Sequence, residues 1–270
     1  MCSSQTLFEF APLGLVFVLL LSGCQRSAPV RNRADENKLP TVFLWAWERP
    51  EDLEFLDPKR FGVAFLAQTL VLRGDHVDFS PRRQPLKVLP ATKLIAVTRI
   101  ESSKTTGEQA DLNSAQKERL VELILKTREL KNISAIQIDY DAAVSEREFY
   151  RGLLQDLRNK LPDNVPLSMT ALASFCLGDR WLADLPVDEA VPMIFRMGTD
   201  DKRIKSFLAG GGDFAEPLCR KSYGITLDEP LEMKFQASRR LYVFNVRAWT
   251  EKDLDSFPFK SIADYEKTRK

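Results

Sequence analysis

Three polar side chains on one predicted strand, Gln137, Asp139 and Asp141, are the residues best placed to do chemistry. They alternate with apolar residues over 135–141, and successive side chains of a strand point to opposite faces, so all three share one face. The two aspartates would have Cβ atoms about 6.5–7 Å apart. Their flexible side chains can bring the two carboxyl groups to hydrogen-bonding distance. Like charges that close raise the pKa of one carboxyl group, which makes it a proton donor near neutral pH.

The chemistry that suits this pair is cleavage of a glycosidic bond. That reaction needs a proton donor together with a second carboxylate or an assisting group of the sugar. We therefore predict that Asp141 and Asp139 are catalytic residues. The alternative is structural: both aspartates form ion pairs with Arg99, Arg196 or Arg247 and hold the site closed.

The residues that follow this strand predict how the acids are presented. Ser145 and Glu148 have the spacing of a capping box, which marks the start of a helix that runs to residue 160. Strand, short acidic loop and helix form one unit of a βα barrel. In such barrels the catalytic residues lie at the carboxyl ends of the strands.

The rest of the chain repeats this alternation, which predicts an α/β fold: a single-domain (βα)8 TIM-like barrel over residues 41–250, followed by a tail or helix over 251–270. The segment 62–72 also fits a helix-like apolar run, and both interpretations stay open. The predicted strands are 41–47, 62–72, 94–100, 135–141, 166–172, 189–197, 223–227 and 240–246, and the predicted helices are 114–130, 145–160, 179–184 and 200–208.

Polar and aromatic residues collect at the predicted strand ends and should meet at the mouth of the barrel. Trp45 and Trp47 lie two apart on one strand face, so they form either a sugar-stacking platform or bulky core. The predicted ligand is a glycan or another polar small molecule. The predicted substrate-binding residues are Trp45, Trp47, Glu48, Arg99, Gln137, Arg196, Asp228, Glu229 and Trp249.

The amino terminus predicts export and a lipid anchor. Residues 11–21 form an apolar run of signal-peptide length, too short to span a bilayer. The following Leu21-Ser22-Gly23-Cys24 resembles the lipobox of bacterial lipoproteins, which implies cleavage of residues 1–23 and acylation of Cys24. Residues 24–40 read as a flexible tether. Gln25 then implies, by the enterobacterial sorting rule, a periplasm-facing anchor in the outer membrane.

Composition excludes several other classes. Lys and Arg number 39 against 38 Asp and Glu, so no basic field predicts nucleic-acid binding. The chain has one histidine and no Cys-x-x-Cys, so we predict no metal and no cofactor. Cys176 and Cys219 could form a disulfide in an oxidising compartment, or stay apart if they lie on opposite faces of the barrel.

Five stretches carry a resemblance to a family of uncharacterised bacterial proteins of unknown function. They are WAWERPED (45–52), QIDYDA (137–142), SMTALASFC (168–176), VPMIFRMG (191–198) and GITLDEP (224–230).

More distantly, residues 135–141 resemble the fourth barrel strand of chitinase-type glycoside hydrolases. That resemblance implies that Asp141 protonates the leaving oxygen and that Asp139 orients an acetamido group of the sugar. Three positions depart from the pattern: Asp141 replaces a glutamate, Gln137 replaces an aspartate, and Phe195-Arg196 replaces a Tyr-Asp pair.

The expected function is therefore that of a glycosidase-like lipoprotein that acts on or binds an envelope or imported glycan. The alternative is a non-catalytic carbohydrate-binding or interaction lipoprotein with a degenerate site. Gln137 and the aspartate at position 141 favour this alternative, whereas the presence of Asp139, Asp141 and the arginines favours the glycosidase.

Overall fold

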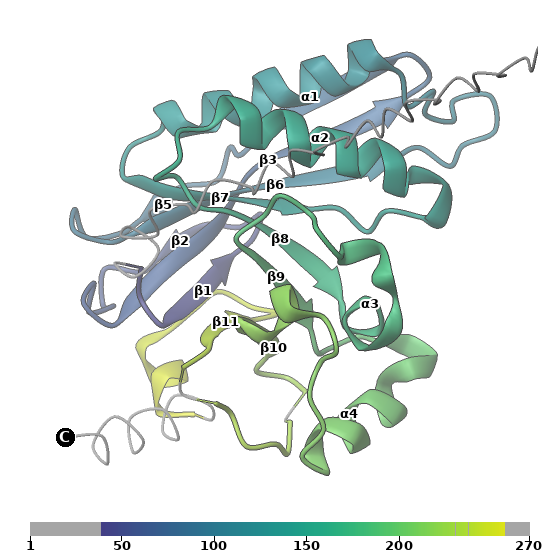
Figure 1. Ribbon diagram of the computed structural model, residues 1–270. Coiled ribbons are helices and arrows are strands. Elements are labelled where there is room, and N and C mark those ends of the chain that lie inside the picture. The colour runs from purple at the N-terminus through teal and green to yellow at the C-terminus, as the bar shows by residue number, and fades with distance from the viewer. Residues whose placement is uncertain (1–38, 230, 237, 257–270) are drawn as a thin grey trace, which may run out of the picture. The chain divides into compact units, whose positions relative to one another are not determined.

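Eight parallel strands pair side by side until the last one meets the first, which closes a TIM-like barrel (Figure 1). The computed structural model describes residues 39–229, 231–236 and 238–256 of a compact unit that covers residues 32–270. Closure depends on β1, which pairs with β11 on one side and β3 on the other. Around the ring the strands are β1 (Val42–Ala46), β3 (Phe61–Arg73), β6 (Leu94–Ser102), β7 (Ile133–Asp139), β8 (Leu167–Leu172), β9 (Glu189–Met193), β10 (Ser222–Thr226) and β11 (Arg240–Phe244). The predicted fold class is confirmed.

The connections are less regular than the predicted alternation. Between β1 and β6 the described chain forms short strands in place of helices: β4 (His76–Pro81) runs antiparallel to β3, while β2 (Glu51–Asp52) pairs with β5 (Leu86–Lys87). Helices follow the four strands from β6 to β9. They are α1 (Ser114–Lys126), α2 (Arg147–Lys160), α3 (Ala173–Gly178) and α4 (Asp201–Ala209).

Short 3-10 turns complete the connections. They cover Thr127–Glu129, Val144–Glu146, Arg180–Leu182, Gly198–Asp200, Pro217–Arg220 and Glu251–Asp255. Part of the predicted tail is therefore one 3-10 turn. Residues 257–270 lie outside the described residues, as do the predicted leader, Cys24 and the tether up to residue 38. Within the described ranges, no helix combines the length and apolar character needed to cross a bilayer.

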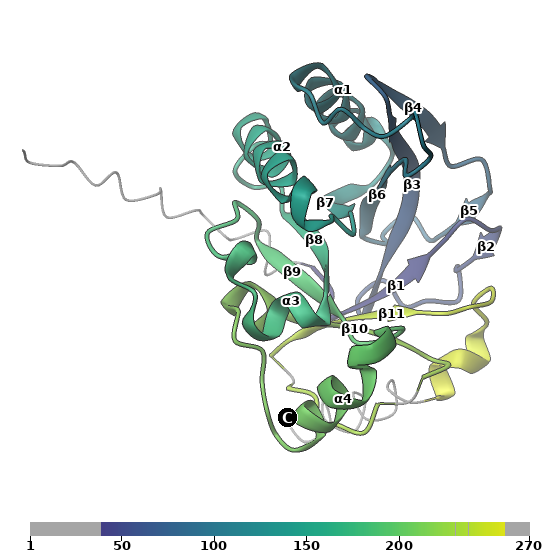
Figure 2. The same cartoon turned by 90° about the vertical axis from the view of Figure 1, so that its right-hand side faces the viewer.

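Amphipathic sequence explains why the two long helices lie side by side against the strands (Figures 1 and 2). Leu120, Val121 and Ile124 form the buried stripe of α1. Asn113 caps this helix: its side chain accepts the backbone N–H of Gln116 at 2.9 Å, and Gln116 accepts the N–H of Asn113 at 3.3 Å. The helix ends four residues earlier than predicted, at Lys126, and continues as a 3-10 turn.

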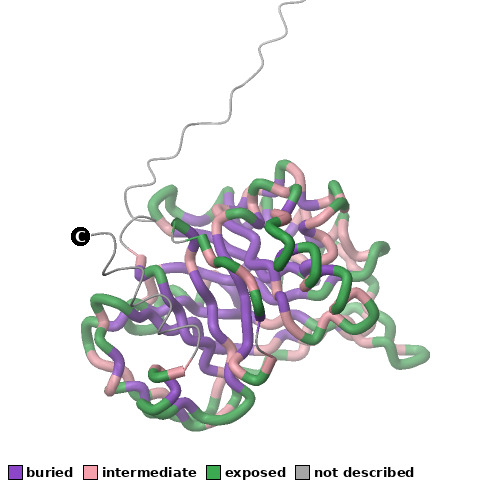
Figure 3. The backbone as a smooth tube through the Cα atoms, turned by 90° about the horizontal axis from the view of Figure 1, so that it is seen from below, coloured by how far each residue is buried: buried purple, intermediate pink, exposed green. Residues whose placement is uncertain are grey.

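The apolar core has two layers, and Figure 3 shows the strands between them as the buried part of the chain. Aliphatic residues fill the layer between the barrel and its helices. The barrel interior is aromatic, with Phe43 stacked on Tyr242 and Tyr242 stacked on Trp45. Gly62 makes room for this stack, because a Cβ atom there would lie 2.3 Å from the ring of Phe43.

Two predicted boundaries near the acids were wrong. Strand β7 ends at Asp139, so Tyr140 and Asp141 belong to the loop that follows. Ser145 does not cap a helix; it lies within a 3-10 turn, and Glu146 accepts the backbone N–H of Ala143 at 2.6 Å. The predicted capping pair, Ser145 and Glu148, is therefore two residues further along the chain than the observed pair, Ala143 and Glu146. The unit of strand, acidic loop and helix is nevertheless present.

Candidate functional site

Asp139 is the carboxylate at the centre of the barrel mouth, the end of the barrel where the parallel strands finish. It points inward from the last residue of β7 and is only 8% exposed. Its Oδ1 accepts the hydroxyl hydrogen of Thr170 on β8 at 2.6 Å. Its Oδ2 lies 3.8 Å from a guanidinium nitrogen of Arg99 on β6.

Burial dominates the titration of Asp139. Desolvation raises its pKa above the ordinary aspartate value, and the charge of Asp141 raises it further. The hydrogen bond from Thr170 and the charge of Arg99 lower the pKa without cancelling the effect of burial. A carboxyl group with a raised pKa at the mouth of a barrel can hold a proton at a higher pH than a surface aspartate can.

Asp141 lies two residues further along, exposed on the loop after β7. Desolvation by the surrounding chain raises its pKa, while the charges of Arg99 and Lys104 lower it. The two aspartates are close enough for the charge of Asp141 to raise the pKa of Asp139. The structure therefore brings together the two predicted acids, one buried and one open to solvent.

Two predicted ligand-binding residues, Gln137 and Trp45, lie below the mouth inside the barrel. Gln137 is fully buried: its Oε1 accepts the indole N–H of Trp45 at 2.9 Å, and its Nε2 donates to Ser168 at 3.1 Å. Trp45 is 3% exposed and stacks on Tyr242. Their prediction as ligand-contacting groups is corrected, because the amide and the indole satisfy each other in the interior. Gln137 and Trp45 therefore form part of the packed layer of the barrel interior directly below the mouth.

Three aromatic rings line the mouth above this layer: Trp47, Phe195 and Phe244. Phe195 and Phe244 stack with ring centroids 5.9 Å apart, and Trp47 meets Phe244 at nearly a right angle at 6.3 Å. All three are half-buried. An aromatic surface of this kind suits the apolar face of a sugar ring. Trp47 was predicted for this surface; the two phenylalanines were not.

Arginines lie over two of these rings. The guanidinium of Arg99 lies 5.9 Å from the ring centroid of Trp47, and that of Arg196 lies 5.5 Å from the centroid of Phe244. These are cation–π distances. At the mouth, a positively charged side chain therefore lies over each of these two rings. The sequence could not predict these contacts, because the partners are far apart along the chain.

Arg196, Asp228 and Glu229, three of the predicted substrate-binding residues, contact one another. Arg196 has a φ of +52°, a left-handed backbone conformation that is costly for a residue with a side chain. The carboxylate of Glu229 accepts the N–H of Arg196 at 3.2 and 3.3 Å, and the Arg196 side chain lies 3.6 Å from Asp228. The hydrogen bond from the hydroxyl of Thr226 lowers the pKa of Asp228, and the charge of Arg196 contributes to the same shift.

Other candidates lie elsewhere. Trp249 is 4% exposed in the outer core, where its indole N–H donates to the carbonyl of Trp45 at 2.9 Å, so its prediction as a ligand-binding ring is corrected. Arg247 forms an ion pair with Asp253 and not with the catalytic candidates. Glu48 is exposed on the rim after β1.

Sequence reasoning missed the residues that hold the mouth in place. Thr170 and Ser168 lie two apart on β8 and hydrogen-bond the neighbouring Asp139 and Gln137. The sequence did contain a signal for these two residues. Ser168 and Thr170 alternate with apolar residues, so they share one strand face, as Gln137 and Asp139 do on the preceding strand. Arg82 binds the carbonyls of Trp47 and Arg49 and so fixes the end of β1, which no local pattern indicates.

Cys176 and Cys219 form a disulfide with Cα atoms 5.9 Å apart. Both sulfur atoms are buried on the outer side of the barrel. The segment after α4 returns to α3, where the backbone N–H of Ala215 donates a hydrogen bond to the carbonyl of Cys176 at 2.9 Å. That path brings together two cysteines that the strand order alone placed apart.

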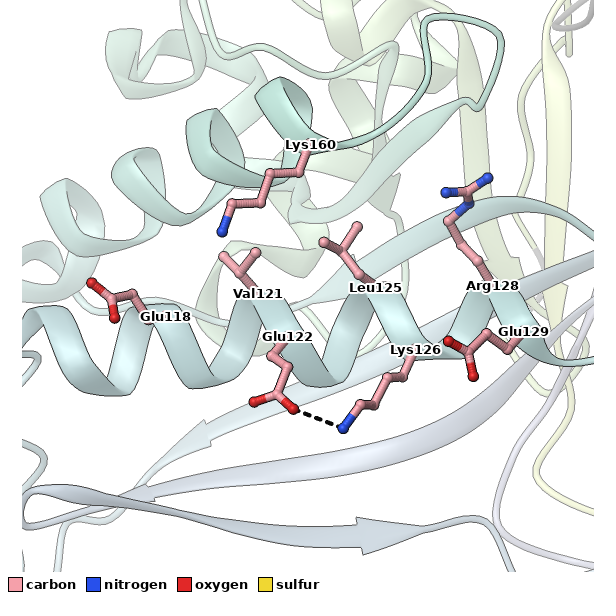
Figure 4. Close-up of a pocket in the computed structure, with 8 residues that line it drawn as sticks. All are labelled: Glu118, Val121, Glu122, Leu125, Lys126, Arg128, Glu129 and Lys160. Carbon is pink, nitrogen blue, oxygen red and sulfur yellow. Dashed lines mark hydrogen bonds and ion pairs between the residues drawn. The ribbon is translucent and has the colours of Figure 1, made fainter.

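A depression of about 530 Å³ lies away from the mouth, on the outer helices (Figure 4). Its lining comes from α1, the turn after α1 and the end of α2: Glu118, Val121, Glu122, Leu125, Lys126, Arg128, Glu129 and Lys160. Among its charged groups, Glu122 and Lys126 form an ion pair at 2.7 Å. Across the described chain, no group of three or more His, Cys, Asp or Glu side chains is arranged to hold a metal ion.

The strand pairing and the mouth thus define a TIM-like βα barrel with one aspartate at the end of its fourth strand and a second in the loop that follows. Residues 91–194, which include both aspartates, match the family model described as Domain of unknown function (DUF3142). The predicted resemblance to a family of unknown function is confirmed over this segment.

No curated protein matches the chain. Among solved structures, the spore cortex-lytic enzyme SleL of Bacillus cereus is similar at 17% sequence identity, with a TM-score of 0.45. The similarity covers 69% of this chain and 51% of that chain, so the chain spans about half the length of that structure.

Proposed function

We propose that this barrel binds a glycan at its mouth and hydrolyses it with Asp141 and Asp139. The observation that carries the proposal is the burial of Asp139 at the end of β7, with Asp141 two residues further on. A buried carboxylate costs stability, and a chain retains that cost mainly where the group has a task. The half-buried rings of Trp47, Phe195 and Phe244 offer the apolar surface that a sugar needs.

The two carboxyl groups then have different roles. Protonated Asp141 gives its proton to the glycosidic oxygen as the bond to the anomeric carbon breaks, and water supplies the new hydroxyl group and returns a proton to Asp141. Asp139, held by Thr170, accepts a hydrogen bond from the sugar and orients it. In a sugar with an acetamido group, the carbonyl oxygen of that group serves as the nucleophile, as the chitinase-type resemblance implies.

The test uses the mature protein with two probes, a β-1,4-linked N-acetylglucosamine tetrasaccharide and peptide-free peptidoglycan strands. Calorimetry measures binding and new reducing ends measure hydrolysis. Asp141→Asn should reduce turnover about 100-fold or more. The control is Asp163→Asn, which replaces an exposed aspartate before β8 and should leave turnover unchanged. If the wild-type protein neither binds nor cleaves either probe, the proposal is wrong.

A second candidate is a non-catalytic glycan-binding protein. It is favoured by Gln137, whose amide is locked between Trp45 and Ser168 and cannot exchange a proton. The same experiment separates the two functions, because binding without new reducing ends supports the second. In that case Asp139→Asn should weaken binding while Asp163→Asn does not.

We also propose that the mature chain begins at a lipid-modified Cys24 and is held by residues 24–40 at the periplasmic side of the outer membrane. The support is Leu21-Ser22-Gly23-Cys24 together with the apolar run before it. Cys24→Ser should leave the leader uncleaved or release the protein from the membrane fraction. Unchanged fractionation with an unchanged mature mass contradicts the anchor.

A further inference from the structure

We propose that Arg99 is a latch that a bound sugar must displace, so that the ring face of Trp47 and the free oxygen of Asp139 become available together. This inference rests on the proposed function and adds a regulatory contact to the same site. It depends on one side chain that occupies two ligand positions at once. The latch is the Arg99 side chain in its contacts with Trp47, Asp139 and Glu101.

The first position is the face of Trp47. Arg99 projects inward near the end of β6, and its guanidinium lies 5.9 Å from the Trp47 ring centroid. A sugar that stacks on this face needs the same space, because both interactions use the π-surface within about 4–6 Å. The two cannot occupy that face together.

The second position is Oδ2 of Asp139. Its partner atom Oδ1 is already bound by Thr170, so Oδ2 is the oxygen left to accept a hydrogen bond from a ligand. The nearest guanidinium nitrogen of Arg99 lies 3.8 Å from Oδ2, which is an ion-pair distance but too long for a hydrogen bond. Arg99 therefore screens this oxygen without binding it tightly.

The remaining contacts explain how the latch can open. Nε of Arg99 donates to Glu101 on the same strand at 2.6 Å, and the side chain is 38% exposed. Half-exposed ion pairs and cation–π contacts are individually weak. The guanidinium can therefore leave Trp47 and Asp139 while it keeps its partner Glu101.

Displacement also changes Asp139 itself. Arg99 is the cation that opposes the effect of burial on this carboxyl group, so the pKa of Asp139 rises when the guanidinium moves away. The other charged groups that act on Asp139 are Asp141 and Glu101, and both raise its pKa.

Arg196 is the matched comparison. It covers the ring of Phe244 at 5.5 Å and pairs with Asp228 at 3.6 Å, so it has the same two kinds of contact. It exerts no resolved charge effect on Asp139. Removal of Arg196 therefore uncovers a ring without releasing the acid.

The experiment measures tetrasaccharide affinity by calorimetry and tryptophan exposure by acrylamide quenching in the full mature protein. Arg99→Ala should bind the β-1,4-linked N-acetylglucosamine tetrasaccharide about 3- to 10-fold more tightly, since the weak contacts no longer have to be broken. It should also increase quenching, and Trp47→Phe in the same background should remove that increase. Arg196→Ala uncovers Phe244 and no tryptophan, so it should not increase quenching. Arg119→Ala, an exposed site on the outer helix α1 where the arginine pairs with Glu122, is the control for affinity and should change neither readout. Arg99→Lys, which keeps the charge but not the planar group, should fall between wild type and Arg99→Ala.

Two results overturn the latch while the proposed function stands. Weaker binding by Arg99→Ala would show that the guanidinium contacts the sugar, and unchanged quenching would show that it does not cover Trp47. If neither the wild type nor Arg99→Ala binds the tetrasaccharide or peptidoglycan strands, the proposed function fails and the latch fails with it. Thermal unfolding of each variant confirms that the barrel is intact.

Discussion

The hydroxyl group of Thr170 on β8 donates a hydrogen bond of 2.6 Å to the buried carboxylate of Asp139 on β7. This bond joins the ends of two neighbouring strands at the centre of the mouth. It also fixes which oxygen of Asp139 is occupied and which is left for a ligand. The bond lowers the pKa of Asp139, whereas burial, the larger effect, raises it.

The first prediction concerns Asp139→Asn. The pKa of Asp139 is raised in the folded state, so ionisation of this group costs folding free energy. That cost is absent below the ordinary pKa of an aspartate, grows as the pH rises, and is complete above the folded-state pKa. The variant should therefore unfold at the same temperature as the wild type near pH 4 and at an equal or higher temperature at pH 7. Thermal unfolding across pH 4–8 measures this.

A variant that is less stable by about 3–5 kcal/mol at pH 7 contradicts this prediction. Such a loss would mean that Arg99 needs the charge of Asp139, which is the structural alternative for the pair. Asp163→Asn is the control, because that side chain is exposed and lies at the other end of the barrel.

The second prediction separates the roles of the two acids. Asp141 is exposed, so Asp141→Asn should change the free energy of unfolding by no more than about 0.5 kcal/mol. Turnover or binding of a glycan should nevertheless fall. Urea unfolding and the reducing-end assay, run on the same preparation, check both parts. A large loss of stability would assign Asp141 a structural role.

The third prediction concerns the layer beneath the mouth. Gln137→Ala opens a cavity and leaves the indole N–H of Trp45 and the hydroxyl of Ser168 without their partner, so it should cost about 2–4 kcal/mol of folding free energy. Gln155→Ala on the exposed side of α2 is the control and should cost less than about 0.5 kcal/mol. Equal losses in the two variants would contradict the interior assignment of Gln137.

The fourth prediction concerns the disulfide. Cys176 and Cys219 are 43 residues apart, and a closed loop of that length is worth about 4 kcal/mol through the entropy of the unfolded chain. The double variant Cys176→Ser, Cys219→Ser should lose about that much stability. The reduced wild-type protein should match the double variant in urea unfolding. If reduction leaves the wild-type unfolding curve unchanged, the pair does not stabilise the fold.

The fifth prediction concerns Tyr150, which is fully buried on α2. Its hydroxyl group has no hydrogen-bond partner among the described residues. A buried hydroxyl without a partner costs about 1–3 kcal/mol, so Tyr150→Phe should raise the melting temperature. The ring contacts with Tyr140 and Trp181 do not need the hydroxyl group. A fall in melting temperature would show that a water molecule binds it.

The sequence by itself determined the strands, most of the helices and the two acids. The inward row on β7 and the apolar stripe of α1 are periodic patterns, and each is set by the geometry of a single element. For that reason the alternation of strand and helix predicted the barrel. The boundary errors lie at the ends of elements: in the loop 140–146, at the end of α1, which is four residues shorter than predicted, and at the end of β9, which stops at Met193 and not at 197.

Only the tertiary structure decided which residues meet. Trp45, Trp47 and Trp249 looked equivalent as mouth residues, yet barrel closure buries Trp45 against Gln137, buries Trp249 against the backbone of β1, and leaves only Trp47 of the three at the mouth. The pairing of Arg99 with Asp139 likewise depends on the register of β6 against β7. These contacts join residues 40 to more than 200 positions apart, so they follow from how the strands close the ring and not from any local pattern.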